Sequence, residues 1–112
     1  MPVFSKRTLV ADGTAASTAT GWIPLDQFST PFNVGFGVVI GTLASGSFSV
    51  QHTFDDVLDP SVTPVAFDHS TVSGKQANID GNYAFAMAAI RFKIMSASGN
   101  DSYTFEVKQV CL

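Results

Sequence analysis

The stretch from Pro31 to Asp56, PFNVGFGVVIGTLASGSFSVQHTFDD, decides the fold of this chain. Large apolar residues hold most of its even positions, from Phe32 to Ile40 and again from Phe48 to Phe54, and small or polar residues lie between them. A period of two is typical of β-strands that bury one face. Small residues separate the two halves from Gly41 to Gly46, and this turn chemistry predicts that the halves pair as an antiparallel hairpin.

Two later segments repeat the alternation. Tyr83 to Ser96 and Ser102 to Leu112 each place apolar residues on one face and polar or charged residues on the other. A short turn, ASGND at residues 97–101, separates them. We therefore expect the last two strands to pair, with Arg91 and Lys93 opposite Glu106.

The remaining segments are less regular. Their composition predicts an edge strand at Pro2–Ala11, a small-residue loop or arm at Asp12–Gly21, an edge strand broken by Pro24 at Gly21–Phe28, a proline-bearing loop at Asp55–His69, and one or two short strands at Ser70–Asn82.

About eight short strands with no convincing helix predict an all-β fold, a two-sheet antiparallel β-sandwich of jelly-roll or immunoglobulin-like kind. We divide the chain into residues 1–21, an N-terminal arm or edge strand with a small-residue linker, and residues 22–112, a single sandwich domain. The residues expected in the core are Trp22, Phe32, Val34, Phe36, Val38, Ile40, Phe48, Val50, Phe54, Ile90, Phe92, Ile94, Phe105 and Val107.

Charge is scarce in this chain. Of its 112 residues, 46% are hydrophobic and 13% are charged, whereas a freely diffusing small domain keeps roughly a quarter of its residues charged. We expect a partner to cover part of the surface, and the protein to form a homo-oligomer. The net charge of −3 and the scattered basic residues argue against nucleic-acid binding. An apolar run of only 11 residues, Val34 to Ala44, argues against a membrane span.

Few residues suggest chemistry. His52 lies on the apolar face of its strand, where it is either a neutral, hydrogen-bonded histidine or a metal ligand. His69 follows Asp68 in a loop that has no nucleophile motif beside it. The carboxylates at positions 55, 56 and 59 either form turns or bind a calcium ion together with loop carbonyls. They lack the spacing of the usual calcium-binding loop. We expect no enzyme activity, no cofactor and no metal, and a packed apolar role for Cys111.

Three segments, GWIPLDQFSTPFNVGFGVVI, FSVQHTFDD and AFAMAAIRFKI, followed by the ending EVKQV, resemble small tailed-bacteriophage proteins. The resemblance touches about half of the chain and includes no catalytic motif. It implies a virion component of the capsid decoration or cement type, which binds the major capsid protein on the outer surface of the head. The N-terminal part carries no resemblance, and Val3, Phe4 and Leu9 are candidates for partner contact there.

Two functions from different classes remain open. The first is a structural virion protein that decorates or cements a head shell. The second is a carbohydrate- or receptor-binding module that uses Trp22, Tyr83, Tyr103 and the Asp-rich loop. Exposed aromatic side chains beside that loop would favour the second, and the same side chains buried in a core would favour the first.

Overall fold

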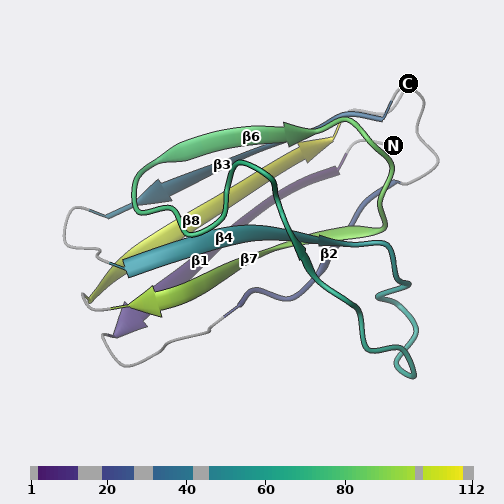
Figure 1. Cartoon of the computed structure of the whole chain (residues 1–112), viewed down its shortest axis with the longest axis horizontal. Helices are drawn as coiled ribbons and strands as arrows, with labels where there is room; N and C mark the ends of the chain where they lie inside the picture. Colours follow the sequence, from purple (N-terminus) through teal and green to yellow (C-terminus); the bar gives the residue numbers. More distant parts are fainter. Residues whose placement is uncertain (1–2, 13–18, 27–31, 42–45, 98–99, 110–112) are drawn as a thin grey trace.

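The computed structural model describes residues 3–12, 19–26, 32–41, 46–97 and 100–109. Within these ranges the protein is all-β, with two antiparallel sheets packed face to face (Figure 1). The predicted two-sheet sandwich is confirmed. No helix long and apolar enough to cross a membrane occurs among the described residues.

Each sheet has four strands. Sheet A has the order β1-β8-β3-β6 and consists of β1 (Val3–Asp12), β8 (Asn100–Gln109), β3 (Val34–Ile40) and β6 (Ile79–Tyr83). Sheet B has the order β2-β7-β4-β5 and consists of β2 (Ile23–Pro24), β7 (Ala89–Ala97), β4 (Gly46–Thr53) and β5 (Phe67–Asp68).

The strand pairing is that of a jelly roll. The first strand pairs with the last, the second with the seventh, the third with the sixth and the fourth with the fifth. This is a long antiparallel ribbon, and further pairing of β3 with β8 and of β4 with β7 rolls it into two sheets. Of the two topologies left open by the sequence, the jelly roll is therefore the one present.

The predicted hairpins are wrong. β3 pairs with β6 and β8 in sheet A, whereas β4 pairs with β5 and β7 in sheet B, so the two halves of the central stretch face each other across the core. β7 and β8 also lie in different sheets, and Arg91 and Lys93 do not pair with Glu106; β7 opposes Gln51 and Ser49 of β4 instead. The period of two identifies the buried face of a strand but not its hydrogen-bonded neighbour, so it fits either arrangement.

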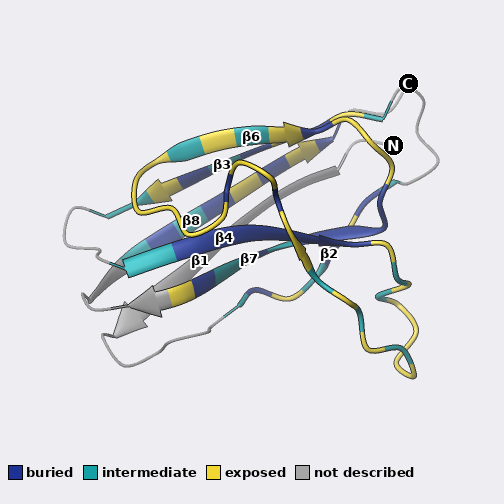
Figure 2. Ribbon diagram, viewed as in Figure 1, coloured by how far each residue is buried: buried dark blue, intermediate teal, exposed yellow. Residues whose placement is uncertain are grey.

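The core lies between the sheets, and most of the expected residues are in it (Figure 2). The expected core residues that are buried are Val34, Phe36, Val38, Phe48, Val50, Ile90, Phe92, Ile94, Phe105 and Val107. Phe32 and Ile40 are partly buried against them.

Two expected core residues lie elsewhere. Trp22 is only half-buried, because Ile23 and Leu25 turn their side chains inward and Trp22 points to the opposite side, where its ring lies 4.4 Å from the guanidinium carbon of Arg91. Phe54 is 56% exposed, because β4 ends at Thr53 and the alternation ends with it.

The N-terminal segment pairs within its own chain. β1 forms an uninterrupted ten-residue register with β8, from Val3 opposite Gln109 to Asp12 opposite Asn100, and lies at the edge of sheet A. The side chains of Val3, Phe4 and Leu9, the linker at residues 15–18 and Cys111 lie outside the described features.

One polar side chain, that of Gln109 at the end of β8, ties the two sheets together. Gln109 is fully buried; its Oε1 accepts a hydrogen bond from the Asp26 backbone N–H at 2.8 Å, and its Nε2 donates to the Asp26 carbonyl at 3.0 Å. The Leu25 N–H in turn donates to the Ala88 carbonyl at 3.0 Å. The end of β8 in sheet A is thus fastened to the segment that follows β2 in sheet B.

Candidate functional site

An aromatic cluster surrounds His52 at the edge of the sandwich where β5 and β6 lie. β4 supplies His52 and, just beyond its end, Phe54; Phe67 belongs to β5, Tyr83 ends β6, and Phe85 lies in the following connection. The centroids of all four rings lie between 4.9 and 5.8 Å from the centroid of the His52 ring. Three strands and one connection therefore converge on a single imidazole.

Three of these rings face solvent. Phe54, Phe67 and Phe85 are 56%, 48% and 50% exposed, and we call them the phenylalanine patch. They are contiguous, since the Phe54 centroid lies 5.9 Å from that of Phe67 and 6.2 Å from that of Phe85. Scattered single apolar residues are normal on a protein surface, whereas a contiguous exposed cluster is a candidate for an interaction site.

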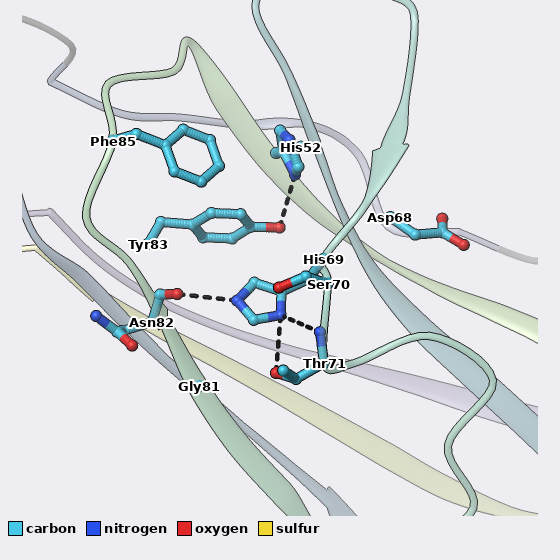
Figure 3. Close-up of a pocket in the computed structure, with 9 residues that line it drawn as sticks. All are labelled: His52, Asp68, His69, Ser70, Thr71, Gly81, Asn82, Tyr83 and Phe85. Atoms are coloured by element: carbon cyan, nitrogen blue, oxygen red, sulfur yellow. Dashed lines mark hydrogen bonds between the residues drawn. The ribbon is translucent and has the colours of Figure 1, made fainter.

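Two histidines that follow or belong to strands of sheet B bond to β6 of sheet A (Figure 3). His52 Nδ1 lies 2.9 Å from the Tyr83 hydroxyl, which connects β4 of sheet B with β6 of sheet A. His69 Nδ1 accepts a hydrogen bond from the Thr71 backbone N–H at 3.1 Å. Nδ1 therefore carries no proton, and in the neutral ring the proton lies on Nε2, which donates to the Asn82 carbonyl at 2.9 Å.

The electrostatics of this cluster favour neutral groups. Burial lowers the pKa of His52, and the neighbouring His69 lowers it further, against a smaller opposing effect of Asp68. Burial also raises the pKa of the Tyr83 hydroxyl, and Asp68 adds to that shift. Both groups are therefore uncharged at neutral pH, as expected for an imidazole–phenol hydrogen bond inside an aromatic cluster.

A pocket of about 350 Å³ opens between β6 and the segment after β5, and it is lined by His52, Asp68, His69, Ser70, Thr71, Gly81, Asn82, Tyr83 and Phe85. Much of its polar lining is engaged within the protein. His52 and His69 are bonded as described, and the Asp68 carboxylate accepts from Gln51 Nε2 at 2.8 Å and from the Ser73 hydroxyl at 2.9 Å. These contacts hold β4, β5 and β6 together, so the pocket lining serves the fold.

A chain of polar contacts crosses the outer face of sheet B. Gln51 donates to Asp68 through Nε2 and accepts from Arg91 Nε at 2.8 Å through Oε1. Arg91 in turn lies over Trp22, and burial lowers the pKa of its guanidinium group. One face of the Trp22 ring is thus occupied by a cation of the same chain.

The loop after β4 projects beyond the end of the sheets (Figure 1). Its carboxylates support its own backbone: Asp55 Oδ2 accepts from the Val65 N–H at 2.8 Å, Asp56 Oδ1 from the Leu58 N–H at 2.9 Å, and Asp59 Oδ1 from the Ser61 N–H at 2.9 Å. In the described part of the chain, no three His, Cys, Asp or Glu side chains gather as a metal site would require.

Two of the three aromatic residues expected in a ligand-binding module are buried. Tyr83 and Tyr103 are each 1% exposed and belong to the core. Phe67 and Phe85, which do form an exposed surface, were not predicted from the sequence. Phe67 follows the irregular proline-bearing loop, where no period assigns a face. Phe85 lies in the segment Tyr83 to Ser96, which was expected to be one strand, but β6 ends at Tyr83 and β7 begins only at Ala89.

No protein-family model matches the chain, and no curated protein matches its sequence. The comparison with solved structures gives low-scoring likenesses. An appendage of Bacillus endospores, described as a disulfide-linked pilus, is 14% identical over 100% of this chain and 92% of that chain, with a TM-score of 0.40. A heated full particle of Israeli acute paralysis virus is 11% identical over 97% and 70%, with a TM-score of 0.42.

A third structure contains the CBM22-1 and GH10 modules of a Clostridium thermocellum xylanase in complex with xylohexaose. It is 10% identical over 97% of this chain and 26% of that chain, with a TM-score of 0.38. All three scores are below 0.5, so these likenesses carry no argument about function.

The pKa of His52 predicts a pH-dependent stability. Because the folded-state pKa lies below the ordinary value of 6.5, the unfolded chain binds more protons as the pH falls through 6.5, and the free energy of unfolding should decrease there. This contribution is fully present above pH 6.5. Urea denaturation between pH 8 and pH 5 should show the loss, and His52→Gln, which keeps a hydrogen-bonding group toward Tyr83, should reduce the slope. An unchanged slope in the variant would contradict this assignment.

Proposed function

We propose that this protein is a structural, non-enzymatic virion component that binds the major capsid protein on the outer surface of a bacteriophage head. The observation that carries the proposal is the phenylalanine patch, a contiguous set of three rings that are each about half exposed. Aromatic residues are enriched at the centres of protein–protein interfaces, and phenylalanine offers no polar group for a hydroxyl-rich ligand. The resemblance of three segments to phage decoration proteins supplies the class of partner.

Two further observations support protein contact over sugar binding. Tyr83 and Tyr103 are buried, and Trp22 is covered by Arg91. Of the three aromatic residues that would serve a carbohydrate module, two are therefore in the core, and the third has one ring face occupied by a cation. The low charged fraction of 13% also fits a protein that is permanently bound to neighbouring subunits, including further copies of itself.

The experiment uses empty heads assembled from the major capsid protein alone and mixed with the purified chain. We expect saturable co-sedimentation with the heads. A Phe67→Ser, Phe85→Ser double variant should lose about 2 kcal/mol or more of binding free energy, about thirtyfold in affinity, as central interface aromatics do.

The matched control is Val39→Ser. Val39 is 54% exposed, comparable to Phe67 and Phe85, but it lies on β3 in sheet A, away from the patch. This variant should bind heads as the unmodified protein does, and circular dichroism should show that all variants are folded. If the folded protein does not bind heads but does bind sugars on a glycan array, the proposal would be overturned in favour of the carbohydrate-binding alternative.

A further inference from the structure

The surface beside the phenylalanine patch is acidic. From Phe54 to Gly74 the sequence contains four aspartates and neither lysine nor arginine. Three of these aspartates lie in the loop of residues 55–66, which begins directly after Phe54, and the fourth, Asp68, directly follows Phe67. We call residues 55–66 the acidic loop. The Asp68 carboxylate is held by Gln51 and Ser73 on the outer face of sheet B, whereas Phe67 stacks on His52, so the free charge next to the patch comes from the loop that follows Phe54.

The acidic loop also exposes apolar side chains. Leu58 is 76% exposed and Val65 is 58% exposed. Hydrogen bonds to the loop carboxylates hold the segments that carry these residues, since the Leu58 N–H donates to Asp56 and the Val65 N–H donates to Asp55. The surface thus alternates apolar side chains with carboxylates that are fixed by their own backbone.

The loop carboxylates have oxygens that can accept hydrogen bonds from a partner. Only one oxygen each of Asp55, Asp56 and Asp59 takes part in the hydrogen bonds found among the described residues. Bonds from the Ser61 N–H and hydroxyl also lower the pKa of Asp59, so this exposed side chain stays ionised in mildly acidic solution. An ionised oxygen without a bond in the chain can accept a charge-assisted hydrogen bond from a lysine or arginine.

We infer that the phenylalanine patch and the acidic loop form one docking surface for a basic protein surface, in which apolar side chains flanked by lysine or arginine contact the phenylalanines. The inference rests on the proposed function, since it names the chemistry of the partner at the same site. Charge complementarity selects this occupant: an acidic protein surface or a nucleic-acid backbone would meet like charges around the apolar centre and be repelled. The phenylalanines supply affinity, and the aspartates accelerate and orient the encounter.

The test measures binding of the chain to the same empty heads at increasing salt concentrations. Asp56→Asn with Asp59→Asn removes two charges, while the amide oxygen can still accept from the Leu58 and Ser61 N–H groups, so the loop keeps its turns. We expect about tenfold slower association at low salt and a shallower dependence of affinity on salt, with little difference from the unmodified protein at high salt.

The control is Asp80→Asn, which removes one exposed charge from β6 outside the acidic loop and should leave the salt dependence unchanged. Binding to heads that does not depend on salt, or that the double variant leaves unchanged, would overturn the basic-partner inference and leave the proposed function standing. A folded protein that does not bind heads at any salt concentration would overturn both. Binding of the double variant that exceeds that of the unmodified chain would show an acidic partner and would also overturn the inference.

Discussion

Replacing Phe36 with Asp should abolish folding. Phe36 lies on the inward face of β3, is 5% exposed, and contacts rings from three other segments: His69, Tyr83 and Phe105, at centroid distances of 5.1, 5.7 and 6.1 Å. An unpaired carboxylate at this point would lose its hydration without a compensating cation, a cost greater than the whole stability of a typical domain. Circular dichroism and size-exclusion chromatography of the purified variant measure the outcome.

A milder substitution provides the quantitative test. Phe36→Ala should lower the free energy of unfolding by about 3–5 kcal/mol, because it removes buried apolar area and leaves a cavity. Val39→Asp is the control on the same strand; Val39 is 54% exposed on the outer face, so the cost should stay near 1 kcal/mol or below, the span of β-propensity. Equal effects at positions 36 and 39 would show that the inward face of β3 is assigned wrongly.

Two glycines on neighbouring strands should respond to the same substitution with opposite signs. Gly81 of β6 lies directly opposite Phe36 in the register, and a Cβ placed there would lie 2.8 Å from the Phe36 ring carbon Cζ. Because that ring is held by its neighbours, Gly81→Val should destabilise the fold by about 1–3 kcal/mol, as overpacking does. The glycine leaves room for the ring to cover the strand.

Gly35 of β3 is the matched control. A Cβ at this position would meet nothing within 4 Å, and the residue is not among the described glycines with positive φ. Gly35→Val should therefore stabilise the protein by about 0.5–1 kcal/mol, the cost of glycine in a strand interior. Thermal and urea denaturation of both variants measure the difference, and a loss of stability at Gly35 similar to that at Gly81 would contradict the assignment of the two faces.

The hydrogen-bonded histidine of the candidate site could be predicted from the sequence, but the phenylalanine patch could not. The hydrogen-bonded reading of His52 agrees with its contact to Tyr83, because an apolar strand face without a second ligand nearby favours that outcome. The phenylalanine patch was not predictable, since Phe54, Phe67 and Phe85 come from three segments whose approach depends on the pairing of β4 with β5 and on the packing of β6 above them. Tyr83 was assigned to a ligand surface for the same reason: nothing local shows that the end of β6 turns inward.

The alternating segments were enough to predict the fold class and the inward apolar residues of β3, β4, β7 and β8, because a period of two is a local property of each segment. The jelly-roll pairing, the assignment of β3 and β4 to opposite sheets and the position of the aromatic cluster could be learned only from the folded chain. These depend on hydrogen bonds between distant segments, such as those of Gln109 to Asp26 across 83 positions. Backbone donors and acceptors are the same in every strand, so the choice of partner is made by the packing of the whole core rather than by any one segment.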